Sequence, residues 1–163
     1  MAGKSGKKFI ASRGIPSSES LYFPSYNSTE VRRFQDNNET QTRNLWSLEE
    51  VINFIFPKKY QEKYHEIAMN FLKLLSKKIH LNGTDISSFV SENNISKATF
   101  YNRVLPRLRR VGLIKVERET LVPVEGKRKY RPMRISLSKT FGNYLMKIGD
   151  SWLAIVDDAR SKQ

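Results

Sequence analysis

Residues 96–103 carry polar and basic side chains whose types and spacing suit the base edges and phosphates of a nucleic acid. If this stretch is helical, Phe100, Val104 and Leu108 share one face, which the pattern predicts to be buried. The opposite face then holds a mostly polar set of side chains: Lys97, Ala98, Tyr101 and Asn102, with Arg103 at its flank. A major groove admits one such helix, and the first turns of the helix face the bases.

The chemistry of each side chain follows from its donors and acceptors. Asn102 can pair bidentately with adenine, and Lys97 or Arg103 can reach guanine. Tyr101 can contact a thymine methyl or a phosphate, unless its ring belongs to the core. The hydroxyls of Ser96 and Thr99, with the amides of the helix N-terminus, suit phosphate oxygens. The predicted DNA contacts of this helix, including one basic residue further along, are Ser96, Lys97, Thr99, Tyr101, Asn102, Arg103 and Arg107.

The charge distribution favours an anionic partner. The 163 residues contain 29 Lys and Arg against 16 Asp and Glu, a net charge of +13. Twelve of the basic but only three of the acidic residues lie between positions 95 and 134, whereas positions 45–94 are balanced. A run of charge is usually a solvated face, but one polarised segment beside a balanced one indicates an anion-binding surface. Nucleic acid is the leading partner for such a chain.

Several classes of function are disfavoured by what the sequence lacks. The absence of cysteine excludes disulfides, thiolate nucleophiles and Cys-ligated zinc. The two histidines, His65 and His80, have no matching carboxylate pair, and neither a Gly-rich phosphate loop nor a nucleophile–base pair is present. We therefore expect no enzyme activity and no cofactor. No apolar run approaches the roughly 20 residues that cross a bilayer, so we expect a cytoplasmic, nucleoid-associated protein without membrane contact.

Two helices are predicted before the candidate DNA-reading stretch. Ser47 and Glu50 form a capping-box pattern that starts a helix, and Pro57 stops it. A second amphipathic helix covers residues 59–79 and ends before the break at Asn82-Gly83. Residues 1–44 lack such periodicity, which predicts a flexible basic tail. Its aromatic residues, around 21–26, are candidates to dock on the body of the protein or on a protein partner.

The elements around the candidate DNA-reading stretch form a compact succession. A short helix capped by Thr84 or Asp85 leads to a turn at Asn93-Asn94, and Ser96 caps a helix that ends at Gly112. Pro106 lies inside this helix, where it lacks an amide donor. The stretch from Phe100 to Gly112 is also one residue longer than in the usual pattern of the family that the sequence resembles (see below). We therefore expect a kink or a one-residue bulge.

The remaining residues predict a small β-ribbon and a long final helix. Strands at 113–118 and 129–137 enclose a tip at 119–131, whose predicted DNA contacts are Lys127, Arg128, Lys129 and Arg131. A helix capped by Ser138 then carries a heptad seam of apolar residues: Phe141, Leu145, Ile148, Trp152, Ile155 and Ala159. We expect the first five of these to form a dimer contact. Gly142 and Gly149 flank the seam, which suggests close packing. We expect the seam to pair with a second copy; the alternative is that it covers its own core.

The order of helix, helix, tight turn, helix and two-stranded ribbon is that of a winged helix-turn-helix. The residues Asn94-Ile95-Ser96-Lys97-Ala98-Thr99-Phe100-Tyr101-Asn102-Arg103 and Leu108-Arg109-Arg110-Val111-Gly112-Leu113-Ile114 resemble the recognition-helix-to-wing passage of MarR- and ArsR-like transcription regulators, especially archaeal ones. The resemblance implies a mainly α fold with a small β-ribbon. It covers roughly residues 59–137, with the C-terminal helix in the place of the family's dimerisation helix. Together with the patterns above, it predicts a flexible tail at 1–44, a winged helix-turn-helix domain with an extra N-terminal helix at 45–137, and a C-terminal dimerisation helix at 138–163.

The function implied by this resemblance is sequence-specific binding of double-stranded DNA by a homodimeric transcription regulator. Recognition helix 96–111 would enter the major groove, and wing 119–131 would contact the adjacent minor groove or the backbone. The alternative is a winged-helix subunit of a larger replication or transcription complex that binds nucleic acid non-specifically. An RNA-binding module is a third possibility, although the chain lacks a stacking-platform motif. The oligomeric state in isolation would separate the first two.

Overall fold

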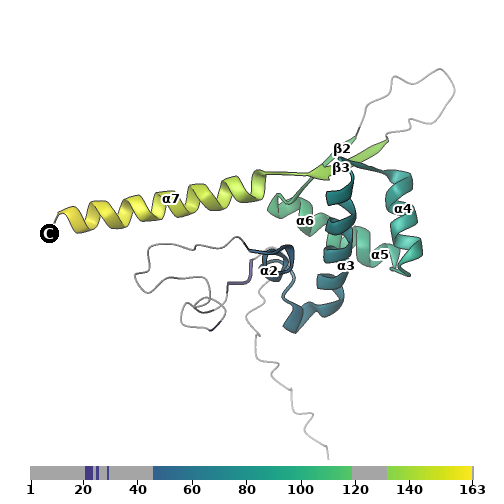
Figure 1. Cartoon of the computed structure of the whole chain (residues 1–163), viewed down its shortest axis with the longest axis horizontal. Helices are drawn as coiled ribbons and strands as arrows, with labels where there is room; N and C mark the ends of the chain where they lie inside the picture. Colours follow the sequence, from purple (N-terminus) through teal and green to yellow (C-terminus); the bar gives the residue numbers. More distant parts are fainter. Residues whose placement is uncertain (1–20, 24, 26–28, 30–45, 119–131, 163) are drawn as a thin grey trace, which may run out of the picture. The chain divides into compact units, whose positions relative to one another are not determined.

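A computed structural model describes residues 21–23, 25, 29, 46–118 and 132–162 (Figure 1). These residues are mostly helical, with one small antiparallel sheet of three strands. The chain separates into two compact units, Met1–Glu66 and Ile67–Gln163. The boundary between the units falls within helix α3 (Lys58–Lys77), whereas the sequence suggested boundaries after residues 44 and 137. Each unit is described below by itself.

Helix α2 (Leu48–Asn53) opens the first unit with the predicted capping box. Ser47 Oγ accepts from the Glu50 amide at 3.4 Å, and Glu50 Oε2 accepts from the Ser47 amide at 2.6 Å. The two bonds satisfy amides that would otherwise have no partner at a helix start. The helix ends at Asn53, three residues before Phe56, the last position that Pro57 would allow. The turn that follows buries Ile55 and Phe56.

Part of the aromatic cluster near the N-terminus docks within the first unit. The Tyr22 amide donates to the Phe54 carbonyl at 2.7 Å. The rings of Phe23 and Trp46 lie 5.6 and 4.8 Å from the ring of Phe54, and Tyr22 meets Tyr60 edge-on at 5.8 Å. The sequence suggested that these aromatic residues dock either on the body of the protein or on a partner, and Tyr22 and Phe23 contact the body. Apart from residues 21–23, 25 and 29, the predicted tail lies outside the described residues.

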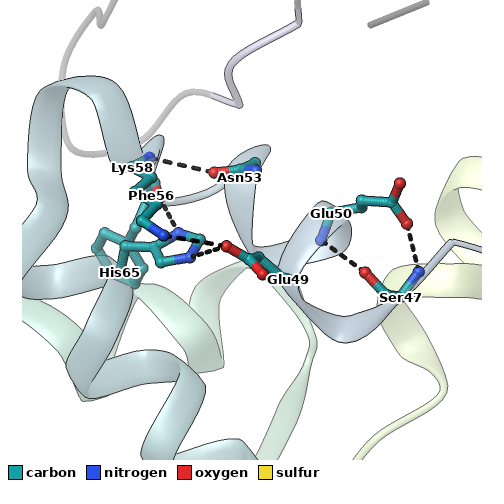
Figure 2. A network of polar contacts seen from close by, with 7 residues as sticks. All are labelled: Ser47, Glu49, Glu50, Asn53, Phe56, Lys58 and His65. Atoms are coloured by element: carbon teal, nitrogen blue, oxygen red, sulfur yellow. Dashed lines mark hydrogen bonds and ion pairs between the residues drawn. The ribbon is translucent and has the colours of Figure 1, made fainter. Parts of the chain in front are cut away.

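A buried histidine ties α2 to the start of α3 (Figure 2). His65 is 3% exposed, and its Nδ1 lies 2.8 Å from the Phe56 carbonyl oxygen, which requires Nδ1 to be the donor. Its Nε2 lies 3.8 Å from Glu49 Oε1. The same carboxylate oxygen accepts a hydrogen bond from Lys58 Nζ at 3.3 Å. The Lys58 amide donates to Asn53 Oδ1 at 3.1 Å. This imidazole therefore has a structural role, and among the described residues no group of acidic and histidine side chains could hold a metal ion.

In the second unit, the later turns of α3 pack against the helices that follow. Helix α4 (Gly83–Glu92) buries Ile86, Phe89 and Val90. Its N-cap is Asn82, and not Thr84 or Asp85 as the sequence suggested: Asn82 Oδ1 accepts from the Asp85 amide at 2.9 Å, and Asp85 Oδ2 accepts from the Asn82 amide at 3.1 Å. Asp85 thus serves as the third-position partner of a capping box, a role in which a carboxylate also favours the positive helix end.

The predicted single long helix is divided into α5 (Lys97–Thr99), a π-helical turn η1 (Phe100–Val104) and α6 (Leu105–Val111). The Leu105 amide bonds to the Phe100 carbonyl, five residues back, which inserts one extra residue. Pro106 follows at the start of α6, where the missing amide of proline is tolerated. The expected one-residue bulge is confirmed.

The sheet contains one more strand than expected. Strands β1 (Leu81–Asn82), β2 (Ile114–Arg118) and β3 (Met133–Leu137) are antiparallel in the order β1-β3-β2, with Ile135 opposite both Leu81 and Val116. The predicted ribbon of β2 and β3 is present, and its tip at 119–131 lies outside the described residues. The sequence missed β1 because two residues before a glycine have no strand periodicity.

Helix α7 (Thr140–Ser161) completes the second unit. It begins after Lys139, so Ser138 is not its cap, although Ser138 Oγ accepts from the Thr140 amide at 3.2 Å. The Phe141 amide donates to the Gly112 carbonyl at 3.0 Å. Gly112 ends α6 with a φ of 87°, a left-handed conformation that favours glycine. None of the described helices is long and apolar enough to cross a membrane.

Candidate nucleic-acid interface

The exposed side of α5 and η1 is supported by a buried apolar side. Phe100, Val104 and Leu108 are all 0% exposed, as the sequence predicted. The Phe100 ring lies 5.0 Å from Phe71 and 5.8 Å from Phe89, so three phenylalanines from α3, α4 and η1 meet in one cluster. Burial of each such side chain contributes about 1.5–3 kcal/mol. The candidate site therefore stands on a fixed element and not on a mobile loop.

The turn that starts this element is also well defined. Asn94 adopts a positive φ of 50°, which asparagine tolerates better than most residues. The Ile95 amide returns to the Val90 carbonyl at 3.0 Å, and Ser96 Oγ caps the Thr99 amide at 3.5 Å. Because Ser96 accepts through its oxygen, its hydroxyl hydrogen can still be offered to a phosphate. The cap predicted at Ser96 is confirmed.

Most of the predicted contact residues of α5 and η1 are exposed in the structure. Ser96, Lys97, Tyr101, Asn102 and Arg103 are exposed, and Thr99 is half-buried. Tyr101 combines the two roles that the sequence left as alternatives. Its ring lies edge-on to Phe100 at a centroid distance of 5.2 Å, and 37% of the residue remains exposed. We call the set Ser96, Lys97, Tyr101, Asn102 and Arg103 the polar face.

The π turn explains why three consecutive residues belong to the polar face. Buried Phe100 and Val104 enclose Tyr101, Asn102 and Arg103, all of them exposed. A turn closed by a bond from residue i+5 to residue i holds more residues than an α-helical turn, so a longer run can face solvent before the chain returns to the core. π-bulges occur frequently at functional sites for this kind of reason.

Arg107 does not join the polar face. It is 8% exposed and lies on α6 between buried Leu105 and Leu108. Burial lowers the pKa of its guanidinium, and repulsion by Arg110 lowers that pKa further. The spacing of the apolar residues already indicated this burial, because Arg107 lies three residues after Val104 and seven after Phe100, on the same face of a helix. The structure thus separates Arg107 from the other candidates of this helix.

Further basic side chains extend the positive surface of the second unit. Arg109 and Arg110 are exposed at the end of α6, where cations favour the helix dipole. On the sheet, Lys115 lowers the pKa of Glu117 through a hydrogen bond and its charge, and Arg134 contributes too. The predicted contacts Lys127, Arg128, Lys129 and Arg131 lie outside the described residues.

The later part of the seam on α7 is exposed. No described residue of α7 is buried, and Ile148, Trp152 and Ile155 are 62%, 63% and 59% exposed. Phe141 and Leu145 are half-buried. Large apolar side chains with this exposure at regular spacing are unusual on a folded surface and typical of contact sites. In the described structure the seam does not cover a core of its own chain.

An open groove of about 620 Å³ between α3 and α4 escaped the sequence analysis. Lys73, Lys77 and Lys78 contribute to its lining together with Asp85. A backbone hydrogen bond from Asn82 and a 3.0 Å contact with Lys78 lower the pKa of Asp85. The lysines lie in a segment that is charge-balanced along the chain, so only the spacing of Lys73 and Lys77, one turn apart, could have indicated this basic patch.

The comparisons with known proteins do not assign the chain to a family. No protein-family model matches it, and no curated protein matches it significantly.

Proposed function

We propose that this protein is a winged helix-turn-helix transcription regulator that binds specific double-stranded DNA sequences as a homodimer. The observation that carries the proposal is the polar face, a set of exposed side chains whose donors and acceptors suit base edges. The other side of the same helix is held by residues that are 0% exposed. In this reading α4 and α5–η1–α6 form the helix-turn-helix, and β2 and β3 form the wing.

The polar face divides naturally into contacts that specify and contacts that position. Asn102 has the donor and acceptor pair that recognises adenine in the major groove, and Lys97 and Arg103 suit guanine. Ser96 and the amides at the start of α5 suit a phosphate, which positions the helix without reading sequence. The half-exposed ring of Tyr101 is available to a thymine methyl.

The wing supplies the second part of the proposal. Residues 119–131 connect β2 to β3 and include Lys127, Arg128, Lys129 and Arg131. Beside a helix in the major groove, such a basic connection would contact the adjacent minor groove or its phosphates. A dimer that neutralises about six to ten phosphates loses roughly 10³- to 10⁵-fold in affinity between about 50 and about 200 mM salt.

One observation favours a second candidate function, a winged-helix subunit of a larger replication or transcription complex. Phe23 and Trp46 flank Phe54 in the first unit and are 63% and 38% exposed. Exposed aromatic rings are enriched at protein interfaces. In that case the polar face would serve non-specific binding, and the chain alone would show no preferred sequence.

Fluorescence anisotropy with the full chain tests the proposal. We would measure binding to a random duplex and to single-stranded RNA at two salt concentrations, and then select a preferred duplex from a random pool. The Arg103→Ala and Asn102→Ala variants remove predicted contacts, whereas Lys63→Ala removes an exposed charge from α3 as a matched control. Binding of the selected duplex that falls steeply with salt and weakens only in the first two variants supports the proposal. Absence of duplex binding at low salt refutes it, and binding without any selectable sequence favours the second candidate.

A further inference from the structure

The glycines of α7 are not explained by the packing of the described residues of this chain. Glycine inside a helix is less stable than alanine by about 1 kcal/mol. A Cβ atom built at Gly142 or at Gly149 meets nothing within 4 Å, so neither position needs glycine to avoid a clash. Both glycines fall in one row beside the exposed seam, which indicates that something outside the described residues approaches the helix closely there.

The seam is self-complementary when two copies of α7 run in opposite directions. If Asp150 lies at the centre, Phe141 faces Ala159 of the partner, Leu145 faces Ile155, and Ile148 faces Trp152. The bulky Phe141 thus meets the small Ala159, and the layers are more even in volume than those of a parallel pair. A parallel pair would stack Trp152 on its own copy and Ala159 on its own copy, which overfills one layer and underfills another.

The residues beside the seam fit the same antiparallel arrangement. On one side, Gly149 faces its own copy and Gly142 faces Val156 of the partner. On the other side, Ser151 faces its own copy and Tyr144 faces Asp158. The smallest residues therefore meet at the crossing point, where the two backbones come closest, and a phenol meets a carboxylate at both ends of the contact.

Helix dipoles also favour opposite directions. The macrodipoles of antiparallel neighbours attract each other.

We infer that α7 pairs with α7 of a second copy in antiparallel orientation, about a two-fold axis that crosses the seam at the height of Asp150, between Ile148 and Trp152. Such an isologous contact closes a dimer and leaves no second edge to extend. The inference rests on the homodimer in the proposed function, because it specifies the direction and register of the contact. It does not depend on which DNA contacts the polar face makes.

Single cysteines test the orientation in the full chain, since the chain itself contains no cysteine. In the antiparallel register, two copies of residue 151 are offset by about 3 Å along the axis and two copies of residue 159 by about 27 Å, at a rise of about 1.5 Å per residue. A short bismaleimide should therefore crosslink Ser151→Cys into a dimer and leave Ala159→Cys monomeric. A parallel pair gives the reverse result, because residue 159 then faces its own copy in the seam.

The outcomes separate this inference from the proposed function. Crosslinking of Ser151→Cys alone supports the antiparallel pair. Crosslinking of Ala159→Cys, or of neither variant, overturns it. Duplex binding by the same preparations is measured independently by anisotropy. Duplex binding without the expected crosslink would leave the DNA-binding proposal intact, and the crosslink without duplex binding would leave the pairing intact. Circular dichroism confirms that both variants retain the helical fold.

Discussion

Replacing Gly149 with leucine should change the stability of the chain and the stability of the dimer in opposite directions. A Cβ at position 149 meets nothing within 4 Å in the described chain. Leucine is a much better helix former than glycine, so α7 should gain roughly 1 kcal/mol per chain. If Gly149 faces its own copy at the two-fold axis, the same substitution places two new side chains at the closest approach of the helices. Overpacking of this kind costs about 1–3 kcal/mol.

The expected result is a weaker dimer built from more stable helices. A loss of 1–3 kcal/mol raises the dimer Kd by roughly 5- to 150-fold. Sedimentation equilibrium measures the Kd, and circular dichroism at a concentration where the chain is monomeric measures the thermal stability. Asn143→Leu is the matched control, because position 143 lies on the outer side of α7 and should gain helix stability without weakening the dimer. An unchanged dimer Kd in Gly149→Leu would refute the argument that a partner helix approaches this residue.

Four further predictions concern the two units and the polar face. Phe100→Ala should lower the free energy of unfolding by about 3–5 kcal/mol in a denaturant titration, because the ring is 0% exposed and meets Phe71 and Phe89. Asn102→Ala should weaken the selected duplex by about 1–3 kcal/mol, measured by anisotropy, and leave random duplex nearly unaffected; equal losses on both would argue against base reading. His65→Phe should destabilise the fold by about 1–3 kcal/mol in chemical denaturation, because the Phe56 carbonyl loses its donor; no change would contradict this structural role. The folded pKa of Asp85 lies below its ordinary value of 3.8, so its contribution to stability is present above pH 3.8 and is lost as the pH falls through the folded pKa. The difference in unfolding free energy between the parent chain and Asp85→Ala should therefore shrink in that acidic range. A difference that does not change with pH would contradict this prediction.

Features of the fold that depend on local chemistry could be predicted from the sequence. The caps at Ser47 and Ser96 and the helix end at Gly112 follow from hydrogen-bonding groups or backbone freedom within a few residues. The π turn was also predictable in kind, because Pro106 in a stretch one residue too long requires an irregularity. Strand β1 was not predictable, since a two-residue strand depends on pairing with β3, which lies about fifty residues further along the chain.

The candidate site shows the same division between local and long-range information. The exposure of Lys97, Asn102 and Arg103 follows from the spacing of the apolar residues around them. The burial of Arg107 follows from the same spacing, because Arg107 lies three residues after Val104 and seven after Phe100, and its charge alone suggested a surface contact. The lysines along the groove depend on long-range information instead. Lys78 and Asp85 are seven residues apart in sequence, and only the fold shows that they line the same groove.

The junction at Gly112 limits how independently two helices can move. The carbonyl of Gly112 accepts from the Phe141 amide, and the Leu113 carbonyl accepts from the Ser138 amide at 2.9 Å. A Cβ atom at position 112 would lie 3.0 Å from both the Phe141 nitrogen and Thr140 Cβ. The two segments therefore pack too closely at this point to admit a side chain without a shift. The last turn of α6 and the first turn of α7 therefore form a stiff joint. If the proposed α7 pair forms, this joint links its geometry to α6, the helix that follows the polar face, so a change in the angle between the two α7 helices would change the distance between the two polar faces.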